Sequence, residues 1–156
     1  MKKGFALLIC IALLFGCAAA DRAVVLPGSR YVIDVPEGMV YSEPQGGDDG
    51  VYAYISDILE MDYLSYTLED TAASDPSESL KDRAKKLEAD GLDVELRQVN
   101  GIDMIVYRIM DEADGAPGIG YVLEDGETVV EVIFWYATQD AAETAKTIME
   151  SIRVSE

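Results

Sequence analysis

The pattern of apolar residues divides the chain into three parts. Residues 5–15 are apolar without interruption, behind two lysines. Residues 17–29 are small and mixed, and from Arg30 onward short stretches alternate apolar and polar residues. An apolar run of this length behind lysines is typical of an export signal, and period-two alternation predicts half-buried β-strands. We therefore predict a signal peptide over 1–16, a short tether over 17–29 and one folded domain over 30–156.

Proline and glycine bound the strands that are predicted in the first part of the domain. The first strand runs over 31–35 and ends at the Pro36-Glu37-Gly38 turn, because proline cannot donate a hydrogen bond to a neighbouring strand. Further strands are predicted at 39–42, 51–56 and 63–68. The pattern leaves the boundary over 57–62 open.

A helix is predicted to follow Asp75. This residue can cap it, Pro76 suits the first helical position, and Glu78 completes a capping box. Gly91 supplies the stop. The apolar stripe of this helix consists of Leu80, Ala84 and Leu87, and its basic residues are expected on a solvated face, with an acidic partner surface as the alternative.

Two hairpins and a closing helix are predicted in the second half. Asn100-Gly101, between strands at 94–99 and 102–110, is a strong hairpin signal because both turn positions need positive φ. The second hairpin joins 119–124 to 128–136 through Asp125-Gly126. The strand at 129–136 is apolar on both faces apart from Glu131, so we expect it to be covered on both faces. The apolar spacing of the closing helix is set by Ala141 or Ala142, Ala145, Ile148 or Met149, and Ile152.

The resulting order is four strands, a helix, four strands and a helix, with antiparallel hairpins. A central strand that is buried on both sides requires layers above and below the sheet. The fold class is therefore α+β, with a central antiparallel sheet covered by helices as an α/β/α sandwich.

This order and several short motifs resemble the PsbP-like superfamily. The motifs are Tyr31-x-Ile33-x-Val35-Pro36-Glu37-Gly38-Met39, the Asn100-Gly101 hairpin and the Ser151-Ile152-Arg153 end of the last helix. The resemblance covers roughly Arg30 to Val154 and implies an antiparallel sheet between helices. The superfamily includes the PsbP extrinsic protein of photosystem II, a Ran-binding nuclear-import factor and small bacterial lipoproteins, of which the lipoproteins match best. Photosynthetic members use histidine-containing elements that this chain lacks, so no binding residue is carried over.

The end of the apolar run offers two cleavage sites. Leu14-Phe15-Gly16-Cys17 resembles a bacterial lipobox, although a small residue is commoner at the position of Phe15. The resemblance implies cleavage before Cys17 and a lipid on its thiol. The alternatives are cleavage after Ala20 by an ordinary signal peptidase, which gives a secreted or periplasmic protein, and an uncleaved anchor. The other cysteine, Cys10, lies inside the apolar run, so the folded domain has no disulfide.

The charge of the chain limits its partners. The formal net charge is −18 and becomes −20 if Lys2 and Lys3 leave with the signal peptide. Nucleic acid is a poor partner for such a surface, and anionic headgroups would repel it. Membrane residence would therefore depend on the acyl chains at Cys17, since two chains suffice for stable anchoring.

The residue inventory argues against most catalytic chemistry. The chain has no histidine, which removes imidazole-based nucleophile pairs and histidine zinc sites. Both cysteines precede the folded domain, which removes thiolate catalysis. Phosphate-loop and nucleophile-elbow motifs are missing as well. We predict no cofactor and no enzymatic activity.

Acidic and aromatic residues supply the remaining candidates. Two acidic loops could offer oxygen ligands to calcium, with Asp48 and Asp49 in one and Asp111 and Asp114 in the other, although ordinary turn chemistry explains both. Glu131 is the single acid of a strongly apolar strand, and we expect it at an edge or a strand end. Seven tyrosines could line a groove, although half-buried packing accounts for them too: Tyr52, Tyr54, Tyr63, Tyr66, Tyr107, Tyr121 and Tyr136.

These observations predict an exported, lipid-anchored envelope protein with a non-catalytic binding or scaffolding domain. Its expected partners are the membrane, through Cys17, and an envelope protein or a cell-wall component. A calcium-binding domain is the alternative, followed by a hydrolase that uses a pair of carboxylates.

Overall fold

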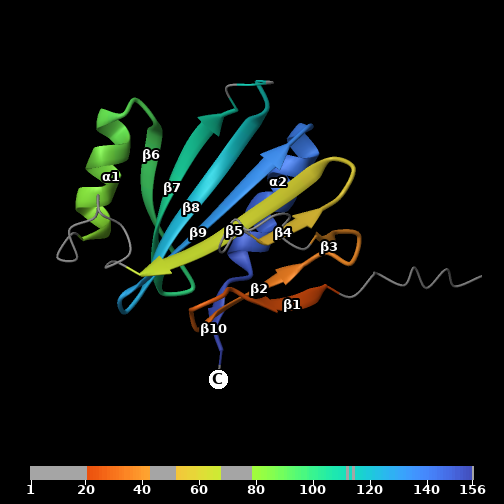
Figure 1. The fold of residues 1–156 in the computed structure, drawn as a ribbon, viewed down its shortest axis with the longest axis horizontal. Helices are drawn as coiled ribbons and strands as arrows, with labels where there is room; N and C mark the ends of the chain where they lie inside the picture. The colour runs from red at the N-terminus through yellow and green to blue at the C-terminus, as the bar shows by residue number, and fades with distance from the viewer. Residues whose placement is uncertain (1–20, 43–51, 68–78, 112, 114, 156) are drawn as a thin grey trace, which may run out of the picture.

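The computed structural model describes residues 21–42, 52–67, 79–111, 113 and 115–155. Most of these residues form β-strands, with one helix in the middle of the chain and one near its end (Figure 1). The elements in chain order are β1 (Arg22–Val25), β2 (Tyr31–Val35), β3 (Val40–Ser42), β4 (Tyr52–Ile55), β5 (Leu59–Thr67), α1 (Leu80–Ala89), β6 (Asp93–Val99), β7 (Ile102–Met110), β8 (Pro117–Asp125), β9 (Thr128–Tyr136), α2 (Gln139–Glu150) and β10 (Arg153–Val154).

The strands form one large and one small antiparallel sheet. The large sheet has the order β3-β4-β5-β9-β8-β7-β6, so β9 lies in its middle and β3 and β6 are its edges. The small sheet has the order β1-β2-β10. Every strand pair in both sheets is antiparallel.

The two helices lie on opposite faces of the large sheet. Because successive side chains of a strand point to opposite faces, Met104 and Val106 of β7 join the main core with α2, whereas Ile105 and Tyr107 join a second core with α1. The small sheet packs on the same side as α2. The predicted α/β/α arrangement is confirmed.

Both hairpins form where the sequence predicts them. Asn100 and Gly101 have φ angles of 52° and 81°, which is the conformation that a two-residue type I′ turn requires. In the second hairpin Asp125 still pairs with Thr128, so the turn is formed by Gly126 and Glu127 rather than by Asp125 and Gly126. Gly126, with φ 67°, supplies the positive φ that the first turn residue needs.

The first helix begins later than Asp75. Its N-cap is Ser79, whose hydroxyl accepts a hydrogen bond from the backbone N–H of Asp82 and donates one to the Asp82 carboxylate. This short local cap defines the start of the helix at Leu80. Asp75, Pro76 and Glu78 lie outside the described residues. The predicted stop is confirmed, because Gly91 has φ 90° and donates to the Glu88 carbonyl.

The segment that was predicted to be a tether contributes a strand to the domain. Residues 22–25 form β1, which pairs with β2 from Arg22↔Val35 to Val25↔Val32. Val24 is buried in the main core, whereas its strand neighbours are exposed. One buried residue in four gives no period-two signal, so only the pairing with β2 reveals this strand.

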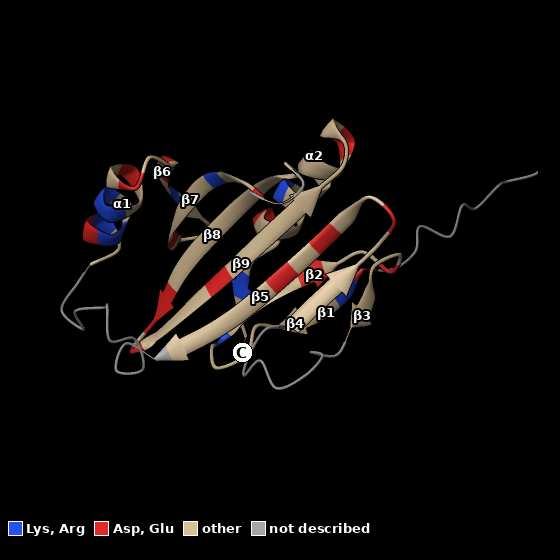
Figure 2. Cartoon of the chain, turned by 45° about the horizontal axis from the view of Figure 1, so that its top comes forward, with Lys and Arg blue, Asp and Glu red and all other residues tan. Residues whose placement is uncertain are grey.

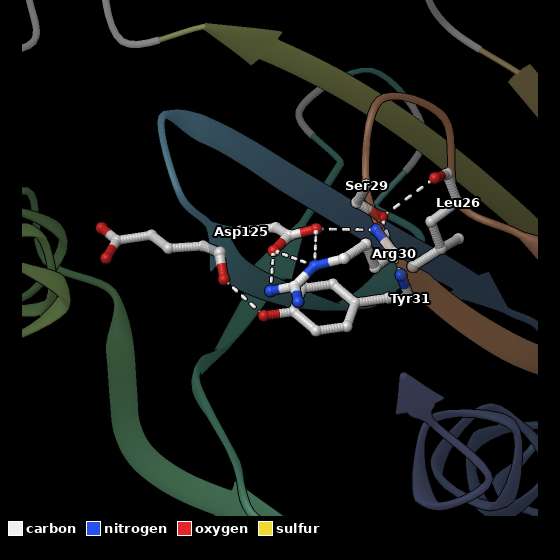
Figure 3. A network of polar contacts seen from close by, with 6 residues as sticks. Leu26, Ser29, Arg30, Tyr31 and Asp125 are labelled. Atoms are coloured by element: carbon white, nitrogen blue, oxygen red, sulfur yellow. Dashed lines mark hydrogen bonds and ion pairs between the residues drawn. The ribbon is translucent and has the colours of Figure 1, made fainter. Parts of the chain in front are cut away.

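A polar network joins the small sheet to the β8–β9 hairpin (Figure 3). The Asp125 carboxylate accepts from the backbone N–H of Arg30 at 2.7 Å and from its guanidinium at 2.6 and 3.0 Å. The hydroxyl of Tyr31 donates to the Glu124 carbonyl at 2.5 Å. These hydrogen bonds with Arg30 lower the pKa of Asp125 below its ordinary value. The network fixes the turn before β2 against the end of β8.

Candidate functional site

One face of the large sheet is covered by α1 at one end only. This helix packs on β6 and β7, in the second core. Beyond it, on β5 and β9, the same face carries half-buried acidic, aromatic and aliphatic side chains, and Figure 2 shows acidic residues along both strands. These side chains belong to Glu60, Asp62, Leu64, Glu131, Ile133 and Trp135.

Two glycines of β8 make room for large aromatic rings on this face. A Cβ on Gly120 would lie 2.1 Å from Cζ of Tyr107, and a Cβ on Gly118 would lie 2.8 Å from Cε3 of Trp135. The rings of Tyr107 and Trp135 therefore lie directly across the β8 backbone. Glycine is needed at both positions because any side chain would occupy the space of a ring.

Each of these rings also contacts a carboxylate. The indole Nε1–H of Trp135 donates to Oδ2 of Asp62 at 3.2 Å. The hydroxyl of Tyr107 donates to Oε1 of Glu131 at 2.5 Å. The aromatic side chains thus hold two acids in fixed positions on one face of the sheet.

Glu60 and Asp62 share that face because they are two residues apart in β5, and both have a raised pKa. Partial burial raises the pKa of Asp62, although the hydrogen bond from Trp135 opposes this effect. Partial burial also raises the pKa of Glu60, and the nearby Asp62 charge adds to the shift. Their negative charges are therefore incompletely stabilised by the protein, and a cation beside them would remove that penalty.

The acids line a hollow of about 390 Å³ at the end of the sheet. Glu60 and Asp62 of β5 and Trp135 of β9 line it. Asp57 comes from the β4–β5 turn and Asp111 from the β7–β8 turn. We call this site the acidic hollow, defined by Asp57, Glu60, Asp62, Asp111, Trp135 and Tyr136.

The expectation for Glu131 is wrong. It lies in the middle of β9, paired with Leu64 on one side and Val122 on the other, and not at an edge or a strand end. A carboxylate is tolerated at this central position because the hydroxyl of Tyr107 reaches across Gly120 and donates a hydrogen bond to it. The full coverage predicted for β9 is also only partly correct, since Glu131, Ile133 and Trp135 are half-buried.

A second polar group lies under α1. Arg83 is 9 % exposed, and its Nε donates to Oε1 of Glu124 at 3.2 Å. Burial raises the pKa of Tyr66, the nearby charges of Glu131 and Glu124 add to this shift, and the charge of Arg83 opposes it. This ion pair anchors α1 to the sheet and keeps that end of the face closed.

Of the calcium candidates, only Asp111 lies in the described residues. Its carboxylate accepts from the backbone N–H of Ala113 at 2.7 Å, as the turn chemistry predicts, and it also faces the acidic hollow. Asp48, Asp49 and Asp114 lie outside the described residues, as does Cys17. Within the described part of the chain, no three acidic residues are grouped closely enough to hold a metal ion.

The tyrosines mostly pack in the two cores. Four of the seven are buried: Tyr54, Tyr63, Tyr107 and Tyr121. Stacked rings connect Tyr52 to Tyr63 at 5.3 Å and Tyr63 to Tyr54 at 6.1 Å between centroids. Of the other three, Tyr136 lines the acidic hollow. The packing interpretation therefore describes most of this set.

A larger, apolar groove of about 800 Å³ lies on the other side of the β4–β5 turn. It runs between the β2–β3 corner, the end of β4 and the first turns of α2. The large side chains at its margin are exposed, with Val40 at 67 % and Ile58 at 48 %. We call it the apolar groove, and its rim consists of Val40, Tyr41, Ile55 and Ile58.

Comparisons with known proteins identify the fold. No protein-family model and no curated protein matches the chain. The solution structure of cyanobacterial PsbP (CyanoP) from Synechocystis sp. PCC 6803 superposes with a TM-score of 0.58 at 13 % identity, over 87 % of this chain and 93 % of that one. The fold is PsbP-like. The chain also matches a crystal structure from Bacteroides thetaiotaomicron VPI-5482, with a TM-score of 0.62 at 12 % identity over 88 % of this chain.

The chain spans about half the length of the Bacteroides protein, because the match covers 49 % of that protein. Similarity at 12 and 13 % identity establishes the fold alone. The fold expected from the strand, hairpin and helix motifs is therefore confirmed, and function must be argued from the acidic hollow.

Two residues of this site, Asp111 and Tyr136, are among the candidates that the sequence offers, but the acids of β5 are not. Their signal was the Glu60-Met61-Asp62 triplet, in which a buried methionine separates two acids. Such a triplet places both acids on one face of a strand, provided that the strand already includes them. Because the boundary over 57–62 was open, the two acids were not assigned to a face.

Proposed function

We propose that this protein is a lipid-anchored, non-catalytic domain that binds a cationic segment of an envelope protein through the acidic hollow. The observation that supports this proposal best is the pair Glu60 and Asp62, both with raised pKa, beside the Trp135 ring. Lysine and arginine side chains form charge-assisted hydrogen bonds with carboxylates, and they are also attracted to indole rings. The hollow offers both interactions together.

The overall charge favours the same class of partner. A net charge of −18 attracts positively charged proteins over a distance and repels acidic ones. The local penalty on Glu60 and Asp62 then adds short-range selectivity. A cationic side chain that displaces water from the hollow would lower the pKa of both acids towards ordinary values.

A non-catalytic role agrees with the chemistry of the hollow. The chain has no histidine, and the carboxylate of Asp62 is held by the indole of Trp135. The acids are therefore fixed recognition groups in this proposal. Among the described residues, neither helix is long and apolar enough to cross a membrane, and the proposed membrane attachment is the lipid on Cys17.

The binding proposal can be tested by photo-crosslinking in intact cells. A benzophenone amino acid at Ala137, which lies exposed at the hollow, should crosslink to one partner. The same group at Leu96, exposed on the far edge strand β6, is the positional control. Replacing Asp62 with Asn and Glu60 with Gln should abolish the Ala137 product. An identical product from both positions, or one that survives the double substitution, would contradict the proposal.

The anchor requires its own experiment. The chain should be recovered in the membrane fraction with the mass of a diacylglyceryl group on Cys17, and Cys17→Ser should release it. Unchanged membrane residence of the Cys17→Ser chain would point to an uncleaved anchor. A soluble wild-type chain that begins after Ala20 would instead indicate ordinary secretion.

A further inference from the structure

The apolar groove lies at the end of the domain where the chain enters it. Arg22, the first residue of β1, is paired with Val35, the last residue of β2. Pro36, which follows Val35, lines the groove. The guanidinium of Arg22 lies over the ring of Tyr54, with Cζ 5.6 Å from the ring centroid. The Tyr54 ring in turn packs on Tyr41 of the rim, at 5.4 Å between centroids. Figure 1 shows the start of β1 beside β3.

The chain between Cys17 and this end of the domain is short. Four residues lie between Cys17 and Arg22, so the two Cα atoms are five steps apart, and at about 3.6 Å for each step the chain reaches at most about 18 Å. A domain of this length has a radius of gyration of about 14 Å. A lipid on Cys17 would therefore hold the β1 end of the domain next to the bilayer, whatever the orientation of the rest of the domain relative to the membrane.

The rim of the apolar groove is suited to that position. Val40 and Ile58 are about half exposed or more, at 67 and 48 %, and Ile55 and Tyr41 are each exposed at 38 %. Val40 and Ile55 are paired across β3 and β4, so their exposed side chains lie side by side. Exposed apolar side chains that lie together mark an interaction surface. Aliphatic side chains favour the acyl boundary of a bilayer, and a tyrosine suits its headgroup level.

We propose that the rim of the apolar groove rests against the bilayer in the anchored protein, with Val40 and Ile58 inserted at the lipid interface. This inference rests on the proposed lipidation of Cys17. It gives the anchored domain one orientation. The β4–β5 turn, which separates the apolar groove from the acidic hollow, then lies close to the membrane, and the hollow opens beside it.

Depth-dependent quenching can test this orientation. The lipidated protein is reconstituted into vesicles of phosphatidylethanolamine and phosphatidylglycerol, with or without dibrominated acyl chains. In a Trp135→Phe background, which removes the single native tryptophan, Val40→Trp should lose most of its emission to brominated lipid. Leu96→Trp, at the opposite edge of the sheet, should be unaffected.

A second measurement avoids the tryptophan substitutions. Amide hydrogen exchange over 38–42 and 56–58 should slow in the vesicle-bound wild type relative to soluble Cys17→Ser, whereas exchange over 94–98 should not change. Anchored protein that shows neither quenching at position 40 nor this protection would overturn the orientation alone. Absence of the lipid mass on Cys17 would overturn both the orientation and the proposed anchor.

Discussion

The close approach of Tyr107 to Gly120 makes Gly120→Ala a demanding test of the sheet geometry. The new Cβ would lie 2.1 Å from Cζ and 2.5 Å from the hydroxyl oxygen of Tyr107. The ring cannot move aside at low cost, because it is buried in the second core and hydrogen-bonded to Glu131. Forced repacking costs about 1–3 kcal/mol, and loss of a hydrogen bond to a charged group adds about 1.5 kcal/mol or more.

The expected loss is therefore about 3 kcal/mol, which is a large part of the ~5–15 kcal/mol that stabilises a typical domain. It should lower the melting temperature by about 10 °C. Urea unfolding of the Cys17→Ser chain, followed by circular dichroism, measures it. Gly38→Ala is the matched control, because its Cβ would meet no atom within 4 Å.

A double-mutant cycle separates this explanation from a general effect of alanine in a strand. Tyr107→Ala removes the ring that the new methyl group would strike. Adding Gly120→Ala to that background should cost less than about 1 kcal/mol, which leaves a coupling of about 2 kcal/mol between the two positions. Equal costs in the two backgrounds would refute the reasoning.

Four further predictions follow from individual contacts. The Tyr121 hydroxyl is buried without a hydrogen-bond partner, and burial raises its pKa to about 12. Tyr121→Phe should therefore leave the stability to urea unchanged or improve it, whereas Tyr31→Phe, which removes the hydrogen bond to the Glu124 carbonyl, should cost about 1 kcal/mol. Ser79→Ala and Gly91→Ala should each cost about 1 kcal/mol by the same assay, because one removes the N-cap of α1 and the other places alanine at φ 90°. The pKa of Asp125 is lowered by its hydrogen bonds with Arg30, so the stability that it contributes is present above the ordinary aspartate pKa near 4 and is lost as the pH falls through the pKa of the folded protein. Asp125→Asn should therefore reduce the dependence of the unfolding free energy on pH in the acid range. Burial raises the pKa of Asp62, so its carboxylate binds the proton more tightly in the folded protein than in the unfolded chain. Trp135 fluorescence should therefore titrate with a midpoint above the ordinary aspartate pKa, and Asp62→Asn should remove that transition and increase stability at neutral pH.

The elements that depend on local chemistry were predictable from the sequence. Asn100-Gly101 specifies its hairpin through two positive φ angles, and the spacing of small and aliphatic residues specifies α2. In contrast, β1 exists because it pairs with β2, and its four residues carry no local signal. The sequence favours Asp75 as the cap of α1, because aspartate and proline are strong helix-start residues, whereas in the structure Ser79 caps the helix.

The candidate site depends on contacts that cross three or more strands. Gly118 directly precedes the strand predicted over 119–124 and Gly120 lies within it, but nothing in the sequence indicates that each accommodates an aromatic ring from a neighbouring strand. The position of Glu131 depends in the same way on Tyr107, which is 24 residues away in the chain. Spacing along the chain cannot show which side chains meet across a sheet, and the acidic hollow is formed by such meetings.

Recognition of cationic side chains by the acidic hollow is most directly tested by titrating the soluble Cys17→Ser chain with a lysine- and arginine-rich oligopeptide while following Trp135 fluorescence. We predict a saturable change that weakens with salt and disappears in the Glu60→Gln, Asp62→Asn double variant. A neutral peptide of equal length and calcium alone should produce no such change. An equal response to the neutral peptide, saturation by calcium alone, or binding that survives the double substitution would contradict the proposed function.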